Sequence, residues 1–341
     1  MARGLNALVV RLDNAGDVLL AGPAVRAVAA RAGPVTLLVG PQGAAAARLL
    51  PGVADVIVYD APWVGFAPPA FDGTAAADLV ARLAGREFTD AVVLTSFHQS
   101  PLPIALLLRM AGVTRITGIS DDYPGALLDV RLRGDPDLPE PERALAVAAA
   151  AGFPRPPGDD GRLAVRRPLP DVRGLAGDGP YVIVHPGASV RSRRWPAERC
   201  AETVGVLADR GLRPVVTGGP DERALTTLVA GRIGTDLGGR TDWPELAAVF
   251  AGASAVVTGN TGPAHLAAAV GAPVVSLFAP VVPAERWAPY GVPRVLLGDQ
   301  AAACRGSRAR DCPVPGHPCL MGVTAADAAD AVEKLIAEGT S

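Results

Sequence analysis

Short, continuously apolar segments alternate with longer helix-like segments along most of this chain, and this alternation constrains its fold more than any other feature. Residues 8–12 and 35–39 are typical of buried strands, and residues 18–32 between them are typical of a helix. Strands that are apolar throughout indicate a parallel sheet covered by helices on both faces. The sequence therefore predicts an α/β fold.

The same alternation continues through both halves of the chain. In the first half it predicts further strands at 56–59, 91–95 and 115–118, and helices at 44–50, 75–84, 102–111 and 142–152. A second series predicts strands at 181–184, 214–217, 255–257 and 274–278, and helices at 196–209, 221–230, 243–251, 263–269 and 325–337. Residues 62–71, rich in proline and aromatic residues, are expected to form a loop over one sheet edge.

The length of 341 residues favours two domains, because single hydrophobic cores stop growing at about 250–300 residues. The segment from residue 154 to residue 180 is rich in proline and glycine and is the best linker candidate. We therefore expect a first domain at 1–170 and a second at 171–341. The last helix is expected to stay with the second domain or to pack back on the first.

Charge and hydropathy narrow the classes of partner. The net charge is −2 and aromatic residues make up 4% of the chain, which argues against nucleic acid as a partner. No apolar run reaches the ~18 residues of a spanning helix, and no signal-peptide core follows Met1. We expect a cytoplasmic, monomeric protein, with peripheral association with the inner face of a membrane left open.

Three of the four cysteines cluster near the C-terminus. Cys304, Cys312 and Cys319 lie there together with His317. Zinc ligation and free thiols are the two interpretations of such a cluster. The spacing lacks the close C-x2-C pairs of zinc ribbons, which favours free thiols.

The run from residue 259 to residue 266, Gly-Asn-Thr-Gly-Pro-Ala-His-Leu, is the strongest indication of a ligand site. Pro263 suits the first turn of a helix, and Gly262 lets the backbone approach a ligand closely. A strand, a loop with Asn260 and Thr261, and a new helix N-terminus form an anion site. His265, on the first turn, can reach the same place, so we expect a nucleotide diphosphate here.

Two other loops of the second half follow predicted strands. The first contains His185, Gly187 and Ser189 and leads to three arginines at a helix start, of which Arg193 and Arg194 precede Trp-Pro. These arginines are interpreted as a phosphate clamp or as a solvated basic loop, and the Pro-Gly turn favours the clamp.

The second loop contains Gly218 and ends at Glu222 on the first helix turn. This carboxylate is suited equally to ribose hydroxyls and to simple helix capping. Carboxyl ends of parallel strands lie at one edge of a sheet, so these loops are expected to meet.

The first domain begins with a similar strand, loop and helix, at residues 11–18. The loop contains Asp13 and Asp17 and has no G-x-G-x-x-G pattern. An acid here is either a helix cap or a general base, and Asp17, beside Gly16, is preferred as the base. Asp121, Asp122 and His98 also follow strand ends.

Four ordered blocks resemble glycosyltransferase family 9, whose best-known members are the ADP-heptose:lipopolysaccharide heptosyltransferases. The blocks are residues 16–18, 185–196, 218–222 and 260–269. The resemblance implies a GT-B fold, in which two Rossmann-like doubly wound domains face each other across a cleft. It also implies inverting transfer of a sugar, heptose or similar, from an ADP-heptose-like donor to a hydroxyl of a cell-envelope glycan or lipid such as lipopolysaccharide core. No cofactor and no essential metal are implied.

The resemblance also implies roles for single residues. Asp17 would be the base, and Arg193 and Arg194 would neutralise the departing diphosphate. Glu222 would hold the donor ribose. The other donor-site residues implied by the matched blocks are His185, Gly187, Ser189, Gly218, Asn260, Thr261, Gly262 and His265.

Two positions depart from the family pattern. The chain has Asn260 where the family usually has an acid, and Arg193 where it usually has lysine. The alternatives to a transferase are a nucleotide-sugar epimerase and a non-catalytic nucleotide-sugar-binding module on the same scaffold, the latter favoured mainly by Asn260.

Overall fold

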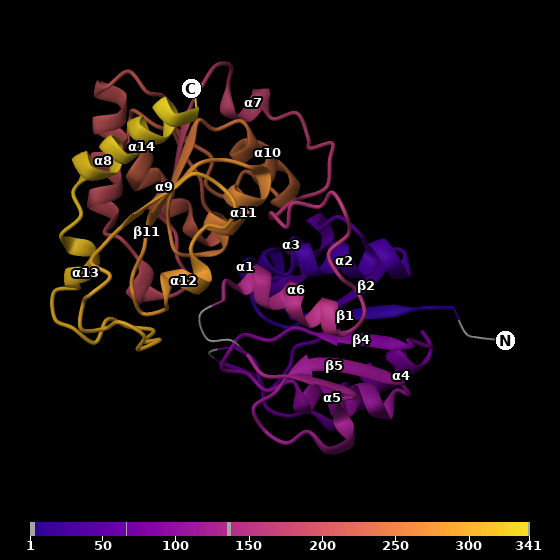
Figure 1. Cartoon of the computed structure of the whole chain (residues 1–341). Helices are drawn as coiled ribbons and strands as arrows, with labels where there is room; N and C mark the ends of the chain where they lie inside the picture. The colour runs from indigo at the N-terminus through magenta and orange to yellow at the C-terminus, as the bar shows by residue number, and fades with distance from the viewer. Residues whose placement is uncertain (1–3, 66, 135–137, 340–341) are drawn as a thin grey trace. The chain divides into compact units, whose positions relative to one another are not determined.

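Continuously apolar strands build two separate parallel sheets, one in each half of the chain (Figure 1). The computed structural model describes residues 4–65, 67–134 and 138–339. The chain divides into one unit at Met1–Ala164 and a second at Val165–Ser341, a few residues before the boundary expected at 170.

The sheet of the first unit has the strand order β3-β2-β1-β4-β5-β6, with all neighbours parallel. Its strands are β1 (Ala7–Arg11), β2 (Val35–Val39), β3 (Val53–Val58), β4 (Asp90–Val93), β5 (Arg115–Ile119) and β6 (Val130–Leu132). Val9 at the centre of β1 pairs with Leu37 on one side and Val92 on the other. Every residue of β1 is buried, because helices cover both faces of this sheet.

Among the described residues of this unit, six α-helices cover the sheet. They are α1 (Ala15–Leu20), α2 (Gly22–Ala32), α3 (Ala44–Leu49), α4 (Gly73–Ala84), α5 (Leu102–Met110) and α6 (Glu140–Ala150), with 3₁₀ turns η1 (Pro41–Gly43) and η2 (Gly125–Leu127). In Figure 1, α2, α3 and α6 lie on one face of the sheet, and α4 and α5 on the other. The single helix expected at 18–32 is wrong. It divides after Leu20, because Pro23 has no N–H to bond the carbonyl of Leu19 and its ring would clash with that carbonyl.

The second unit repeats the plan with the strand order β12-β11-β10-β7-β8-β9, again parallel. Its strands are β7 (Val182–His185), β8 (Pro214–Val216), β9 (Thr235–Asp236), β10 (Ala255–Gly259), β11 (Val274–Leu277) and β12 (Arg294–Leu297). The strands β6, β9 and β12 were not predicted. All three are short, partly exposed edge strands, and none has more than three consecutive apolar residues.

The helices of the second unit are α7 (Arg173–Ala176), α8 (Ala197–Asp209), α9 (Arg223–Ala230), α10 (Trp243–Ala251), α11 (Gly262–Val270), α12 (Ala284–Trp287), α13 (Pro318–Met321) and α14 (Ala325–Gly339), with 3₁₀ turns η3 (Arg191–Arg193) and η4 (Pro220–Glu222). The helix predicted at 325–337 is confirmed as α14, and a capping box starts it. Thr324 N donates to Asp327 Oδ2 over 2.8 Å, and Asp327 N donates to Thr324 Oγ1 over 3.1 Å. The helix packs on α8 and on strands β10 to β12.

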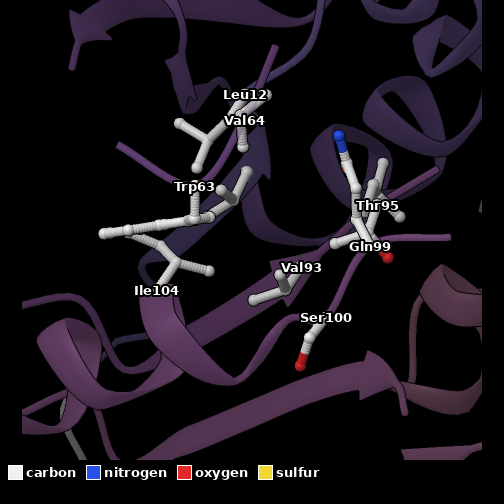
Figure 2. Close-up of a pocket in the computed structure, with 10 residues that line it drawn as sticks. Leu12, Trp63, Val64, Val93, Thr95, Gln99, Ser100 and Ile104 are labelled. Carbon is white, nitrogen blue, oxygen red and sulfur yellow. The ribbon is translucent and has the colours of Figure 1, made fainter. Parts of the chain in front are cut away.

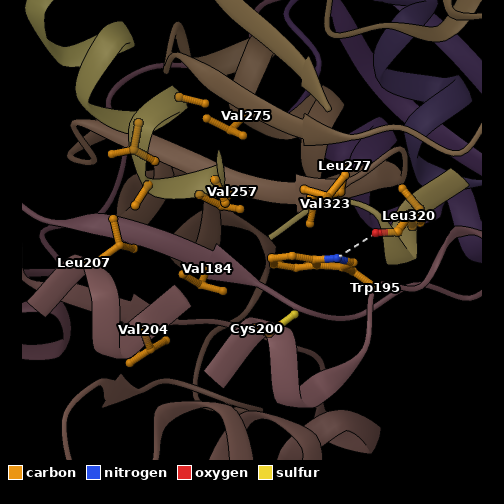
Figure 3. Close-up of a cluster of buried hydrophobic side chains, with 14 of the residues drawn as sticks. Val184, Trp195, Cys200, Val204, Leu207, Val257, Val275, Leu277, Leu320 and Val323 are labelled. Atoms are coloured by element: carbon orange, nitrogen blue, oxygen red, sulfur yellow. Dashed lines mark hydrogen bonds between the residues drawn. The ribbon is translucent and has the colours of Figure 1, made fainter. Parts of the chain in front are cut away.

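The core of the second unit lies between α8, α14 and the sheet (Figure 3). Trp195 lies in this core near Cys200 and Leu320, and its Nε1–H donates to Leu320 O over 3.2 Å. This bond fixes the start of α8, which follows directly. Within the described part of the chain, no helix is both long and apolar enough to cross a membrane.

Candidate active site

The loops after β7 and β8 meet at the carboxyl edge of the second sheet, as predicted. His185 ends β7, and its Nδ1 lies 3.0 Å from Thr217 Oγ1, just after β8. Its Nε2 lies 3.9 Å from Glu222 Oε2. Burial lowers the pKa of His185, against the opposite effect of Glu222. The imidazole is therefore neutral at pH 7 and suited to hydrogen bonding rather than to carrying charge.

The carboxylate of Glu222 fills the space above two glycines. A Cβ at Gly187 would lie 2.0 Å from Glu222 Oε1, and a Cβ at Gly218 would lie 3.2 Å from Glu222 Oε2. Gly219 N donates to Glu222 Oε2 over 2.8 Å, which is a helix-capping contact. Capping and a ligand role are compatible, because a carboxylate has four acceptor sites. A side chain at 187 would displace the Glu222 carboxylate from this position.

The arginine loop at η3 lies against the loop that precedes α11. Arg193 Nη1 donates to Asn260 O over 3.2 Å, and Arg194 Nε donates to Ala188 O over 2.6 Å. A Cβ at Gly259 would lie 3.0 Å from Arg193 O, so glycine at the end of β10 permits this close approach. The structure thus brings together Arg193 and the Thr-Gly loop. Ser189, between the two loops, is exposed.

The predicted helix after β10 is confirmed as α11. Thr261 is its N-cap with extended backbone angles, Pro263 lies in the first turn, and Gly271 ends the helix in the left-handed conformation at φ 88°. The first N–H groups of a helix have no partner within it. His265 is buried on the first turn, and Gly262 is the first helical residue. This helix start therefore has the polarity of an anion site.

Asn260 has a structural role that sequence reasoning missed. Its Nδ2 donates to Ala279 O over 3.1 Å, and its Oδ1 accepts from Ala279 N over 3.3 Å. The buried amide thus joins the loop after β10 to the loop after β11. A carboxylate has no donor for Ala279 O, so asparagine suits this backbone pairing better than an acid.

The C-terminal loop braces the arginine loop, which the sequence did not reveal. Ser192 N donates to Arg310 O over 2.8 Å, and Ser192 Oγ donates to Ala309 O over 2.6 Å. His317 Nε2 lies 3.0 Å from Ser192 O. The one sequence sign was the position of His317 in the Cys/His cluster. The C-terminal loop holds the backbone between Arg191 and Arg193, and it therefore positions the arginines predicted to clamp a phosphate.

The cysteines of this loop lie close to one another. Burial, and after it the neighbouring Cys304 and Cys312 thiols, raise the pKa of Cys319 to about 12. Cys312 Sγ donates to Val314 O over 3.3 Å. In the residues that the structure describes, no group of three or more His, Cys, Asp or Glu side chains is arranged to hold a metal ion.

In the first unit, Asp17 belongs to a buried charge cluster around Arg11. Arg11, at the end of β1, is buried, and its Nη2 lies 2.9 Å from Asp17 Oδ1 and 3.2 Å from Glu140 Oε2. The same nitrogen lies 3.0 Å from Ser96 Oγ, and Arg11 Nε lies 2.9 Å from Asp13 Oδ2. One guanidinium thus orients three carboxylates from two distant segments.

The two loop acids differ in exposure. The side chain of Asp17 is 20% exposed and that of Asp13 is 8% exposed. Burial raises the pKa of Asp13 to about 6, against the lowering effect of Arg11, and Gln99 Nε2 donates to its Oδ1. Asp17 is therefore the carboxylate more accessible to a substrate, and Asp13 is a buried partner of Arg11.

Sequence reasoning missed Arg11, Ser96 and Glu140. Arg11 carried a sign, because a charged side chain at the end of a buried strand needs a partner. Nothing local pointed to Glu140, which lies 129 residues further along the chain. Asp121, Asp122 and His98 are exposed at the same sheet edge.

Comparisons with known proteins identify the family of the chain. The family profile described as Glycosyltransferase family 9 (heptosyltransferase) matches residues 78–316, a segment that begins after Asp17. The chain is 29% identical over 167 residues to lipopolysaccharide heptosyltransferase 3 of Escherichia coli, covering 47% of this chain and 48% of the relative. It is 30% identical over 213 residues to lipopolysaccharide heptosyltransferase 1 of Pseudomonas aeruginosa, covering 59% and 58%. The chain thus matches less than two thirds of the length of either relative.

Solved structures show the same fold over the full length. A glycosyl transferase of family 9 from Veillonella parvula has a TM-score of 0.79 at 17% identity, covering 99% of both chains. The ADP-heptose lipopolysaccharide heptosyltransferase II of Escherichia coli has a TM-score of 0.74 at 19% identity, covering 99% of this chain and 100% of the other. The predicted α/β fold of GT-B type, with two Rossmann-like units, is confirmed. Because the family profile covers more than half of its residues, the chain belongs to glycosyltransferase family 9.

Proposed function

We propose that the protein is an inverting glycosyltransferase that moves a sugar, heptose or similar, from a nucleotide diphosphate donor to a hydroxyl of a glycan or lipid-linked acceptor. Membership of the family supports the reaction class. The names of the relatives, lipopolysaccharide heptosyltransferases, favour an ADP-heptose-like donor and an envelope acceptor.

The observation that carries the proposal is the guanidinium of Arg193 beside the N-terminus of α11, bound to Asn260 O. When the bond from the anomeric carbon to the diphosphate oxygen breaks, negative charge develops on the departing diphosphate. Fixed cations and helix N-termini stabilise such charge, often as the largest catalytic contribution. Arg193, Arg194, Thr261 and His265 would surround this diphosphate, and no metal is needed in this scheme.

The remaining donor contacts follow from the same loops. Glu222, held above Gly187 by Gly219 N, presents its other lone pairs to the ribose hydroxyls. On the acceptor side, Asp17 takes the proton of the attacking hydroxyl as its oxygen bonds the anomeric carbon. Arg11 holds the Asp17 carboxylate, so it is a positioning residue.

The clamp is tested with a panel of nucleosides, nucleoside diphosphates and their sugars. Arg193→Ala should weaken binding of the preferred nucleoside diphosphate about 10- to 100-fold, since hydrogen bonds to charged groups are worth about 1.5–3 kcal/mol. Nucleoside affinity should change little. Arg191→Ala is the matched control, because Arg191 is in the same loop but exposed and paired with Asp311. If calorimetry showed equal losses of affinity for the nucleoside and the nucleoside diphosphate, the proposed role of Arg193 as a phosphate clamp would be wrong.

The base is tested with Asp17→Asn, which keeps the size of the side chain and an acceptor for Arg11. Transfer should fall about 10²- to 10⁴-fold, as for loss of a general base, while donor affinity stays within a few-fold. Product formation and donor binding are measured on the same preparation. Turnover close to wild type would exclude Asp17 as the base.

A further inference from the structure

The Nη2 group of Arg11 has more acceptors around it than N–H groups to give them. It carries two N–H groups, yet Asp17 Oδ1 lies at 2.9 Å, Ser96 Oγ at 3.0 Å and Glu140 Oε2 at 3.2 Å. These acceptors come from α1, from the loop after β4 and from α6. Because three oxygens share two N–H groups, each acceptor limits what the other two receive.

Glu140 is buried and is held from its other side as well. Its side chain is 1% exposed in the first turn of α6, and its Oε1 lies 3.8 Å from Arg143 Nη1. Arg143 also donates to Thr95 O in the loop after β4, which carries Thr95 and Gln99 in Figure 2. Helix α6 packs against α1, the helix that carries Asp17. Glu140 is therefore a fixed anchor for the guanidinium.

The other end of the guanidinium is fixed too. Arg11 Nε lies 2.9 Å from Asp13 Oδ2, and Gln99 Nε2 donates to Asp13 Oδ1. Together with Glu140 at Nη2, these contacts hold the plane of the guanidinium. Arg11 cannot turn further toward Asp17 without breaking one of them.

Asp17 meets Arg11 through one oxygen only. Its Oδ1 accepts from Nη2, and within the described part of the chain no hydrogen bond or ion pair reaches its Oδ2. The side chain of Asp17 is 20% exposed, whereas that of Arg11 is 2% exposed. Arginine and a carboxylate frequently pair through both oxygens, in a bidentate fork. The single contact therefore leaves Oδ2 as the oxygen that a substrate can reach.

Stability alone does not account for this cluster of charges. Burial raises the pKa of Asp13 to about 6 in spite of Arg11, so the charge of Asp13 at neutral pH costs stability. Replacing buried ion pairs by apolar groups of similar volume is often neutral or stabilising. The cluster is better explained by the geometry that it imposes on Asp17.

We propose that Glu140 is a positioning residue for the base: by holding Arg11 at Nη2, it keeps Asp17 in a single contact and leaves Asp17 Oδ2 to take the proton. This inference rests on the proposed transferase function and assigns its proton acceptor to one atom. In the transfer, the attacking hydroxyl gives its proton to Oδ2, its oxygen bonds the anomeric carbon, and the diphosphate leaves with the electron pair of the broken C–O bond. Without the Glu140 carboxylate, the guanidinium turns and forks onto both oxygens of Asp17.

The first test needs no substrate. The full chain is treated with a water-soluble carbodiimide and glycinamide at pH 6, and amide formation at Asp17 is followed by peptide mass spectrometry. Asp17 should react in wild type and about tenfold more slowly in Glu140→Ala, because both of its oxygens then accept from Arg11. Glu142→Ala, which removes an exposed acid from the same helix turn, is the matched control and should react as wild type does.

The labelling result decides the geometry. Equal rates for Glu140→Ala and wild type, or no reaction of Asp17 in wild type, would overturn the proposal. Glu140→Leu keeps the volume of the side chain without an acceptor, and it takes the place of Glu140→Ala should that variant not fold.

The second test measures the reaction itself. Release of ADP from ADP-heptose, with water as the acceptor, is followed at pH 7.5. The kcat of Glu140→Ala should fall about 10- to 100-fold with KM unchanged, since misplacing a catalytic group costs this much. Glu140→Gln should retain most of the activity, because its amide oxygen still accepts from Arg11 Nη2. Equal losses in both variants, or a change in KM alone, would contradict a positioning role.

Failure of the transferase function is reported separately. If wild type releases no ADP, or if Asp17→Asn releases it as fast as wild type, the proposed donor or the proposed base is wrong. The labelling of Asp17 in the Glu140 variants still decides whether Glu140 keeps Oδ2 free of Arg11.

Discussion

Replacing Asp13 by asparagine should change the pH dependence of stability of the first unit by an amount that follows from burial. The pKa of Asp13 is raised from its ordinary 3.8 to about 6, first by burial, which Arg11 only partly offsets. Because the native state holds this proton more tightly than the unfolded state, ionisation of Asp13 destabilises the fold as pH rises from about 4 through about 6. Two pKa units correspond to about 3 kcal/mol.

The substitution removes this penalty and leaves one acceptor oxygen, which can serve either Gln99 or Arg11; the cost of the lost acceptor does not depend on pH. Arg11 remains compensated, since Asp17 and Glu140 still face it. We therefore expect the free energy of unfolding of Asp13→Asn to rise relative to wild type as pH increases. Between pH 5 and pH 8 the relative gain should be about 1.4 kcal/mol, a tenfold change in the opening equilibrium.

Amide hydrogen exchange of peptides from β1 and β4 measures this difference in opening free energy between variant and wild type. The measurement does not assume two-state unfolding of both units. Exchange rates of variant and wild type are compared at each pH, so the intrinsic exchange rate cancels. Asp160→Asn, which removes an exposed carboxylate of the same unit, controls for the loss of one charge. A ratio of rates that stays constant from pH 5 to pH 8 would refute the argument that burial of Asp13 opposes its charge.

Two further substitutions test the donor loops. Gly187→Ala should weaken nucleoside diphosphate binding at least tenfold in calorimetry, because its Cβ would lie 2.0 Å from Glu222 Oε1. The control Gly205→Ala has open space around its Cβ and should leave binding unchanged. Equal affinities of Gly187→Ala and wild type would show that Glu222 does not contribute to binding. Asn260→Asp should lower the free energy of unfolding by about 1–3 kcal/mol at pH 7 in urea titrations, because a carboxylate cannot donate to Ala279 O. The loss should shrink at pH 4, where a protonated acid donates again, and a loss independent of pH would contradict this reason.

Features encoded within a few residues were determined by the sequence alone. The apolar central strands predicted two parallel sheets, because a strand without polar positions must be covered on both faces. The start of α11 followed from Pro263, whose backbone preference is local. The order of the Gly-rich loops also indicated the family.

Only the tertiary structure decided which distant groups meet. Arg11 contacts Glu140 across 129 positions, and Ser192 is braced by a loop more than 100 positions later. Asn260 was expected to contact the donor, yet its side chain pairs with the backbone of Ala279. Such contacts depend on strand order and packing, which bring together segments whose own sequences carry no sign of each other.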